Sequence, residues 1–149
     1  MKYEKEISDQ LNELLIKNYD AEKGYINAMK DVDNVNLKKF FKDIAAERSR
    51  FARELRTEIL TYGELPEDTG SFKGSLHRNW MSLKATFSSN NEETILNEAL
   101  RGEKASLEEY NELLTNNTFP SRLIQMLRAH RNAIEAAINS VKVYEDVLS

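Results

Sequence analysis

The sequence contains no cysteine, and it has only five glycines and two prolines among 149 residues. The lack of cysteine excludes disulfides and thiolate chemistry. Because glycine and proline interrupt helices, their scarcity favours long helices over a strand-rich fold. The sequence also lacks an apolar run of about 18 residues, which a membrane span would need, and its start lacks the apolar segment of a secretory signal. These absences predict a cytoplasmic protein that does not enter a membrane.

Positive charge is in deficit as well. Lys and Arg number 21 against 25 Asp and Glu, which gives a formal net charge of −4. Since nucleic-acid-binding proteins usually carry a basic face, we expect no nucleic-acid partner. The length suffices for one domain with a hydrophobic core and is too short for two comfortable ones. We therefore expect a single domain over residues 1–149.

Apolar residues recur at intervals of three and four in four stretches, and this periodicity predicts four amphipathic helices. Polar, turn-forming residues separate the first helix from the second and the third from the fourth, so we expect two antiparallel helical hairpins. The expected helices cover residues 4–31, 36–61, 92–115 and 120–147.

A long crossover, residues 63–91, lies between the two predicted hairpins. Within it, apolar residues at helical spacing predict a shorter amphipathic helix: Phe72, Leu76, Trp80, Leu83 and Phe87. A connection of this length can return the chain along the outside of the bundle, as it does in ferritin-like folds. The expected fold is therefore all-α, a ferritin-like four-helix bundle.

Each predicted main helix carries one strongly polar residue near the middle of its apolar stripe. Counting from the two turns places all four at about the same height in the bundle. Buried carboxylates are costly unless they are paired, protonated or bound to metal. Di-iron bundles meet this cost with cations, held by a Glu from each of two helices and a Glu-x-x-His from each of the other two. The four residues are candidate ligands for iron or manganese: Glu22, Glu47, Glu103 and His130.

Only part of that ligand pattern is present. The second helix reads "ERSR", with Arg50 where a His would stand, and the fourth reads "LRAH", with Leu127 where a Glu would stand. Arg50 and a protonated His130 would nearly neutralise three carboxylates. We therefore favour a metal-free polar network over a single-metal site, and both over a di-metal site. On this interpretation, loss of Arg50 leaves buried carboxylates unpaired and lowers the free energy of unfolding by about 3–5 kcal/mol.

Four further residues are candidates for the site. Tyr19, Tyr25 and Tyr110 lie near the polar layer, where we expect each to pack its ring and hydrogen-bond a neighbouring carboxylate. Electron donation is the alternative role for them. His77, on the crossover helix, is expected to fix that helix by a hydrogen bond, with a role as ligand or proton donor as the alternative. The apolar faces are wider than one core seam requires. We expect part of the additional apolar surface to lie under the crossover and the remainder to form a homodimer face.

Four stretches carry a resemblance to a known family: "DVDNVNLKKFF", "AERSRFARELR", "LPEDTGSFKGSLHRNWMSLK" and "EALRGEKASLEEY". They resemble an uncharacterised bacterial family of ferritin-like four-helix-bundle proteins, over roughly residues 7–140, and the crossover is the most specific portion. The resemblance implies a fold similar to ferritins, rubrerythrins and the di-iron stress proteins, with no activity attached. Of the di-iron ligands, the resemblance implies only four in this sequence: Glu22, Glu47, Glu103 and His130.

The functional interpretation that we favour is a non-enzymatic cytoplasmic bundle protein whose polar layer is the remnant of a metal site. A stress-related role follows only by analogy with similar folds. One alternative is a metal-binding redox protein that uses the four candidate ligands. Another is a helical module that presents a face to a protein partner.

Overall fold

The structure is a computed structural model, and it describes residues 2–67 and 92–148. Those residues form four helices and no strand: α1 (Lys2–Asp31), α2 (Val35–Thr61), α4 (Glu92–Asn116) and α5 (Ser121–Leu148). Each helix end lies within two residues of the range expected from the apolar periodicity. The prediction of an all-α four-helix bundle is confirmed.

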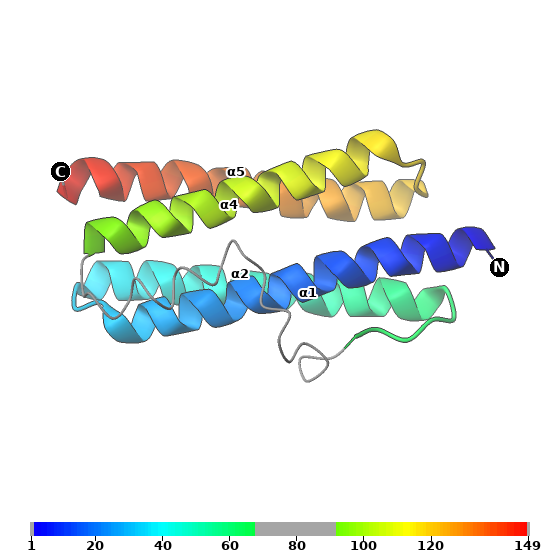
Figure 1. The fold of residues 1–149 in the computed structure, drawn as a ribbon, viewed down its shortest axis with the longest axis horizontal. Coiled ribbons are helices and arrows are strands. Elements are labelled where there is room, and N and C mark those ends of the chain that lie inside the picture. Colours follow the sequence, from blue (N-terminus) through cyan, green and yellow to red (C-terminus); the bar gives the residue numbers. More distant parts are fainter. Residues whose placement is uncertain (1, 68–91, 149) are drawn as a thin grey trace.

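The helices pair as two antiparallel hairpins, α1 with α2 and α4 with α5, as predicted (Figure 1). The two hairpin turns lie at opposite ends of the bundle, so that α2 and α4 run in the same direction (Figure 1). The connection between them therefore joins opposite ends, as in bundles with one long crossover. Kinship with ferritins stays a prediction. The predicted crossover helix, including His77, falls within 68–91 and lies outside the described residues.

Polar contacts fix the ends of the hairpins. Asn34 caps α2, because its side chain accepts a hydrogen bond of 3.0 Å from the Leu37 amide. The Asn34 amide in turn donates to Glu92 at the start of α4, at 3.1 Å. Near the other end of α2, the carboxylate of Glu58 accepts hydrogen bonds of 3.0 Å from Arg122 of α5. Each end of the bundle therefore carries a polar link between the two hairpins.

The chain leaves α2 through Gly63, whose φ of 76° lies in the left-handed region that glycine adopts without strain. It then runs beside α1. Asn12 donates to the Leu65 carbonyl at 3.2 Å and accepts from the Glu67 amide at 2.8 Å. The Tyr19 hydroxyl donates to the Glu67 carbonyl at 3.2 Å. The beginning of the crossover is therefore attached to α1.

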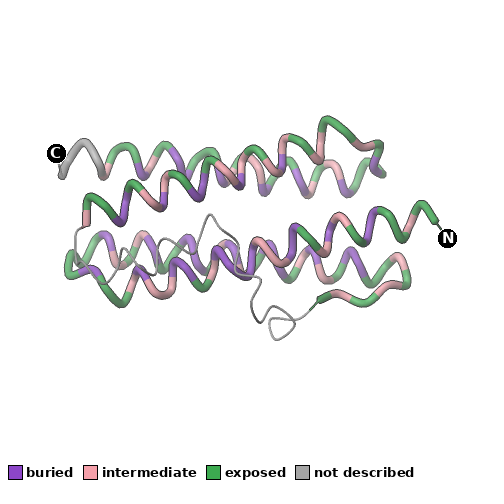
Figure 2. Tube along the Cα trace, viewed as in Figure 1, coloured by how far each residue is buried: buried purple, intermediate pink, exposed green. Residues whose placement is uncertain are grey.

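Buried residues line the inner faces of all four helices (Figure 2). The apolar ones form two clusters, one toward the α1–α2 turn and one toward the α4–α5 turn. On α2 the first cluster ends at Ala45 and the second begins at Phe51, and Arg48 is buried between them. On α4, Glu103 lies between Ala99 and Tyr110 in the same way. The core is thus divided by a polar layer near its middle.

None of the helices in residues 2–67 and 92–148 is both long enough and apolar enough to span a membrane.

Candidate functional site

A buried ion pair lies at one end of the polar layer. The Arg48 guanidinium on α2 donates from Nη2 to Oε1 of Glu103 on α4 at 3.0 Å, and these side chains are 1% and 0% exposed. The Tyr25 hydroxyl on α1 donates to the same oxygen at 2.8 Å. Within the described part of the chain, Arg48 Nε and Glu103 Oε2 have no hydrogen-bond partner. The pair is therefore joined through a single carboxylate oxygen.

The pKa shifts reflect how completely this pair is buried. Burial raises the pKa of Tyr25 well above its usual value, and the negative charge of Glu103 raises it further. Burial alone would lower the pKa of Arg48, but the Glu103 carboxylate offsets that effect, and the net pKa is raised. Tyr25 is therefore a neutral donor and Arg48 a permanent cation at physiological pH.

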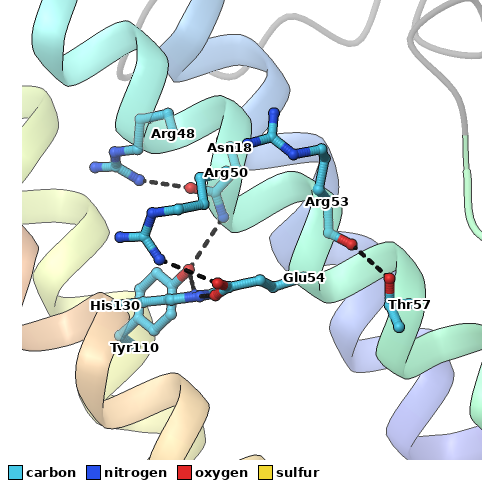
Figure 3. Close-up of polar contacts among 8 residues, drawn as sticks. All are labelled: Asn18, Arg48, Arg50, Arg53, Glu54, Thr57, Tyr110 and His130. Carbon is cyan, nitrogen blue, oxygen red and sulfur yellow. Dashed lines mark hydrogen bonds and ion pairs between the residues drawn. The ribbon is translucent and has the colours of Figure 1, made fainter.

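From Arg48 the hydrogen bonds continue through α1 to α4 (Figure 3). Arg48 Nη1 donates to Asn18 Oδ1 at 2.8 Å, and Asn18 Nδ2 donates to the Tyr110 hydroxyl oxygen at 3.1 Å. Asn18 Nδ2 also donates to the Leu14 carbonyl at 3.0 Å. The pKa of Tyr110 is raised by burial. The phenol oxygen of Tyr110 thus accepts one hydrogen bond and keeps its own proton to donate.

His130 on α5 accepts the hydrogen bond that the Tyr110 hydroxyl donates. Its Nδ1 lies 2.9 Å from the Tyr110 hydroxyl, and its Nε2 lies 2.7 Å from Oε1 of Glu54 on α2 (Figure 3). The ring is 0% exposed and stacks on Phe51, with ring centroids 4.0 Å apart. Burial lowers the pKa of His130 to about 4, so the imidazole is neutral at pH 7. We infer that Nε2 carries the proton, because an ionised carboxylate can only accept.

Glu54 brings the network to the surface. Its side chain is 39% exposed, and its second oxygen accepts a hydrogen bond of 3.0 Å from Arg50, which is 48% exposed. Burial opposes ionisation of Glu54, but the hydrogen bond from His130 and the charge of Arg50 lower its pKa overall. The complete network touches all four helices in the order Tyr25, Glu103, Arg48, Asn18, Tyr110, His130, Glu54 and Arg50.

The structure changes the expected role of two residues. Arg50 was expected in the core layer, but it is exposed, and the buried guanidinium belongs to Arg48. Successive helical residues turn by about 100°, so residues two apart point in widely different directions. His130 was expected to be protonated, but burial keeps it neutral. Among residues 2–67 and 92–148, the buried positive charge of the layer therefore belongs to Arg48.

The four candidate metal ligands are not equivalent. Glu103 and His130 are buried, whereas Glu22 and Glu47 are only half-buried. Partial burial raises the pKa of Glu47. Among residues 2–67 and 92–148, no three His, Asp or Glu side chains are grouped as metal ligands would be. The donor set does not fit the metal centre predicted from the sequence, because a guanidinium contacts Glu103 and both nitrogens of His130 are engaged.

The tyrosines follow the sequence expectation in part. Tyr25 packs in the core and bonds a carboxylate, as expected. Tyr110 bonds a histidine and an asparagine, and Tyr19 bonds the backbone at Glu67 and the side chain of Arg56. Asn18, Arg48 and Glu54 were not expected at the site from the sequence. For Arg48 a signal was present, since Ile44, Arg48, Phe51 and Leu55 also follow helical spacing.

A family model described as a domain of unknown function (DUF2383) matches residues 6–116, which is more than half of the chain. The match covers most of α1 and all of α2 and α4, with the residues from Asn18 to Tyr110, whereas His130 lies beyond it. No curated protein sequence matches the chain at a significant level. The chain belongs to the DUF2383 family of domains of unknown function.

Proposed function

We propose that this protein is a non-enzymatic helical bundle protein in which a metal-free polar layer holds the two hairpins in register. The observation that carries the proposal is the buried contact between Arg48 and Glu103. A divalent cation bound to Glu103 would lie beside a guanidinium that cannot lose its proton. The layer is thus neutralised by the chain's own charge, where similar folds use a metal.

His130 supports the same conclusion. A metal ligand needs a free nitrogen lone pair. Here Nδ1 accepts the hydrogen bond of Tyr110, and Nε2 carries the proton that faces Glu54. Metal binding by His130 would require the loss of one of these two buried hydrogen bonds, which costs free energy.

The layer can specify how the hairpins pair. Apolar contacts are non-directional, so a hairpin could slide along its partner at modest cost. A slide by one helical turn would separate Arg48 from Glu103 and leave two buried charges unpaired. The resulting penalty, several kcal/mol, disfavours every register except the observed one.

Metal titration tests the metal-free part of the proposal. Chelator-treated protein is titrated anaerobically with ferrous iron and separately with Mn²⁺, and metal retention after desalting is measured by mass spectrometry. We expect no stoichiometric retention and an unchanged Tm. One or two retained equivalents that disappear in Glu103→Ala and His130→Ala, but persist in the exposed control Glu93→Ala, would establish the metal-binding redox alternative instead.

A double variant tests the register part. Arg48→Met combined with Glu103→Leu replaces the ion pair by apolar side chains of similar size. We expect a smaller loss of stability than in Arg48→Met alone, because no buried charge is left unpaired, although Tyr25 and Asn18 each lose one hydrogen-bond partner. We also expect broadened NMR resonances and a weaker near-ultraviolet circular dichroism signal. Sharp, wild-type-like spectra from the double variant would contradict a register role.

A cytoplasmic location, a stress-related role, a homodimer and the absence of a nucleic-acid partner stay predictions from the sequence. Light scattering of the purified protein checks the homodimer directly.

A further inference from the structure

Three residues at the surface end of the network form a unit that charge neutralisation does not require. Tyr110, His130 and Glu54 are linked by hydrogen bonds of 2.9 and 2.7 Å, and they lead from a buried phenol to a half-exposed carboxylate (Figure 3). We propose that Tyr110 is a redox-active tyrosine, which gives an electron to a one-electron oxidant while its proton moves to His130. The proposal does not depend on the metal-free register function above.

The geometry supplies what oxidation of a phenol needs. Removal of an electron makes a phenol strongly acidic, so a proton acceptor must already be within hydrogen-bond reach. His130 Nδ1 lies at 2.9 Å, and Asn18 donates to the same phenol oxygen, which leaves the hydroxyl hydrogen directed at His130. Because burial keeps His130 neutral, its Nδ1 lone pair is available.

The step balances as follows. An oxygen-centred radical derived from a peroxide takes one electron from Tyr110 by tunnelling and one proton from water, which gives an alcohol and a hydroxide ion. The Tyr110 O–H bond breaks and an N–H bond forms at His130 Nδ1, which gives a neutral tyrosyl radical beside an imidazolium. The Glu54 carboxylate, already bonded to Nε2, stabilises that imidazolium. A thiol later returns the electron and becomes a thiyl radical, and its proton neutralises the hydroxide ion. His130 returns its own proton to the Tyr110 oxygen.

Tyr25 offers a comparison within the same core. Its hydroxyl donates to Glu103 at 2.8 Å, so it also has an acceptor. Proton transfer to Glu103 would, however, remove the negative partner of fully buried Arg48, which is costly. Protonation of His130 instead places a cation beside a carboxylate that water partly solvates. Oxidation is therefore favoured at Tyr110 over Tyr25.

Burial also protects the radical. Tyr110 is 0% exposed, so two radicals on different molecules cannot couple through their rings. Phe51 stacks on His130 and covers the proton acceptor. Once the phenol is reduced, the proton on His130 Nδ1 faces the phenolate oxygen at hydrogen-bond distance and returns to it.

Flash photolysis tests the proposal. Chelator-treated wild type, Tyr110→Phe and the matched control Tyr25→Phe are oxidised with photogenerated tris(bipyridine)ruthenium(III), and radicals are trapped by freezing for electron paramagnetic resonance. We expect a tyrosyl signal in the wild type and in Tyr25→Phe, and loss of most of it in Tyr110→Phe. An undiminished signal in Tyr110→Phe, as exposed Tyr3 would give, would overturn the proposal.

A second variant tests the positioning role of Glu54. Glu54→Gln retains a side chain of the same size at a half-exposed position, so folding is preserved, which circular dichroism checks. Without the carboxylate the imidazolium loses its stabilising charge. We expect radical formation to slow by about 100-fold, the lower end of the usual contribution of a positioned acid or base. A wild-type rate in this variant would overturn the role assigned to His130 and Glu54.

Discussion

Glu103 and Glu54 lie toward opposite ends of one hydrogen-bond network, yet they are held in different ways. Glu103 is 0% exposed and is paired with a buried guanidinium and a buried phenol. Glu54 is 39% exposed and is bonded to a neutral imidazole and to an exposed arginine. The degree of burial therefore determines which partner a carboxylate needs.

The physical reason lies in solvation. A fully buried carboxylate has lost its water, and only a full positive charge with further donors offsets that loss. A carboxylate that keeps part of its water is already stabilised, so a neutral donor is sufficient. Arg48 is therefore essential to Glu103, whereas Arg50 adds little to Glu54.

Removal of Arg48 tests this contrast most strongly. Arg48→Met leaves Glu103 buried with only the Tyr25 donor, and we expect the free energy of unfolding to fall by about 3–5 kcal/mol. Urea denaturation followed by circular dichroism measures the change. A loss below about 1 kcal/mol would mean that Glu103 does not depend on its cation, and the comparison would fail.

Acid should destabilise the protein through His130, at the other end of the network. The pKa of His130 is lowered by burial from 6.5 to about 4, so the unfolded chain binds more protons between these values. The stability contributed by neutral His130 is therefore complete above pH 6.5 and is lost as the pH falls toward 4, by about 3 kcal/mol in all. The lowered pKa of Glu54 acts in the same direction.

Urea unfolding at pH 7 and at pH 4.5 measures this dependence, with His130→Gln as the control that removes the titrating group. The change in the free energy of unfolding between the two pH values is compared for wild type and variant. The difference isolates the contribution of His130 from that of the carboxylates. Parallel pH profiles for wild type and variant would show that His130 is not held neutral by the fold.

The two buried tyrosines differ in the charge of the group to which they donate. Tyr25→Phe removes a donor from a charged carboxylate, and we expect a loss of about 2 kcal/mol. Tyr110→Phe removes a donor from a neutral imidazole, and we expect about 1 kcal/mol. Thermal unfolding of the two variants in the same buffer shows which of them loses more stability. A larger loss in Tyr110→Phe than in Tyr25→Phe would contradict the assignment of charge within the network.

Arg50→Ala should have the smallest effect. Its side chain is 48% exposed and bonds Glu54 within one turn of the same helix, so we expect a loss of about 0.5 kcal/mol or less. The variant is the matched control for Arg48→Met in urea denaturation. A loss of about 3 kcal/mol would restore Arg50 to the role expected from the sequence.

The four helices could be predicted from the sequence alone, because apolar periodicity and backbone hydrogen bonding act over a few residues. The hairpins could be predicted as well, since the connections at 32–34 and 117–120 are short. The burial of Glu103 and His130 followed from their places on apolar stripes.

Only the tertiary structure decided which arginine enters the core. Glu47, Arg48 and Arg50 all lie close to the apolar stripe of α2, and a rotation of the helix by one residue changes which of them faces inward. That rotation is set by packing against residues distant in the sequence. The charge of His130 is decided in the same way, because its pKa depends on burial by helices that come together only in the folded protein.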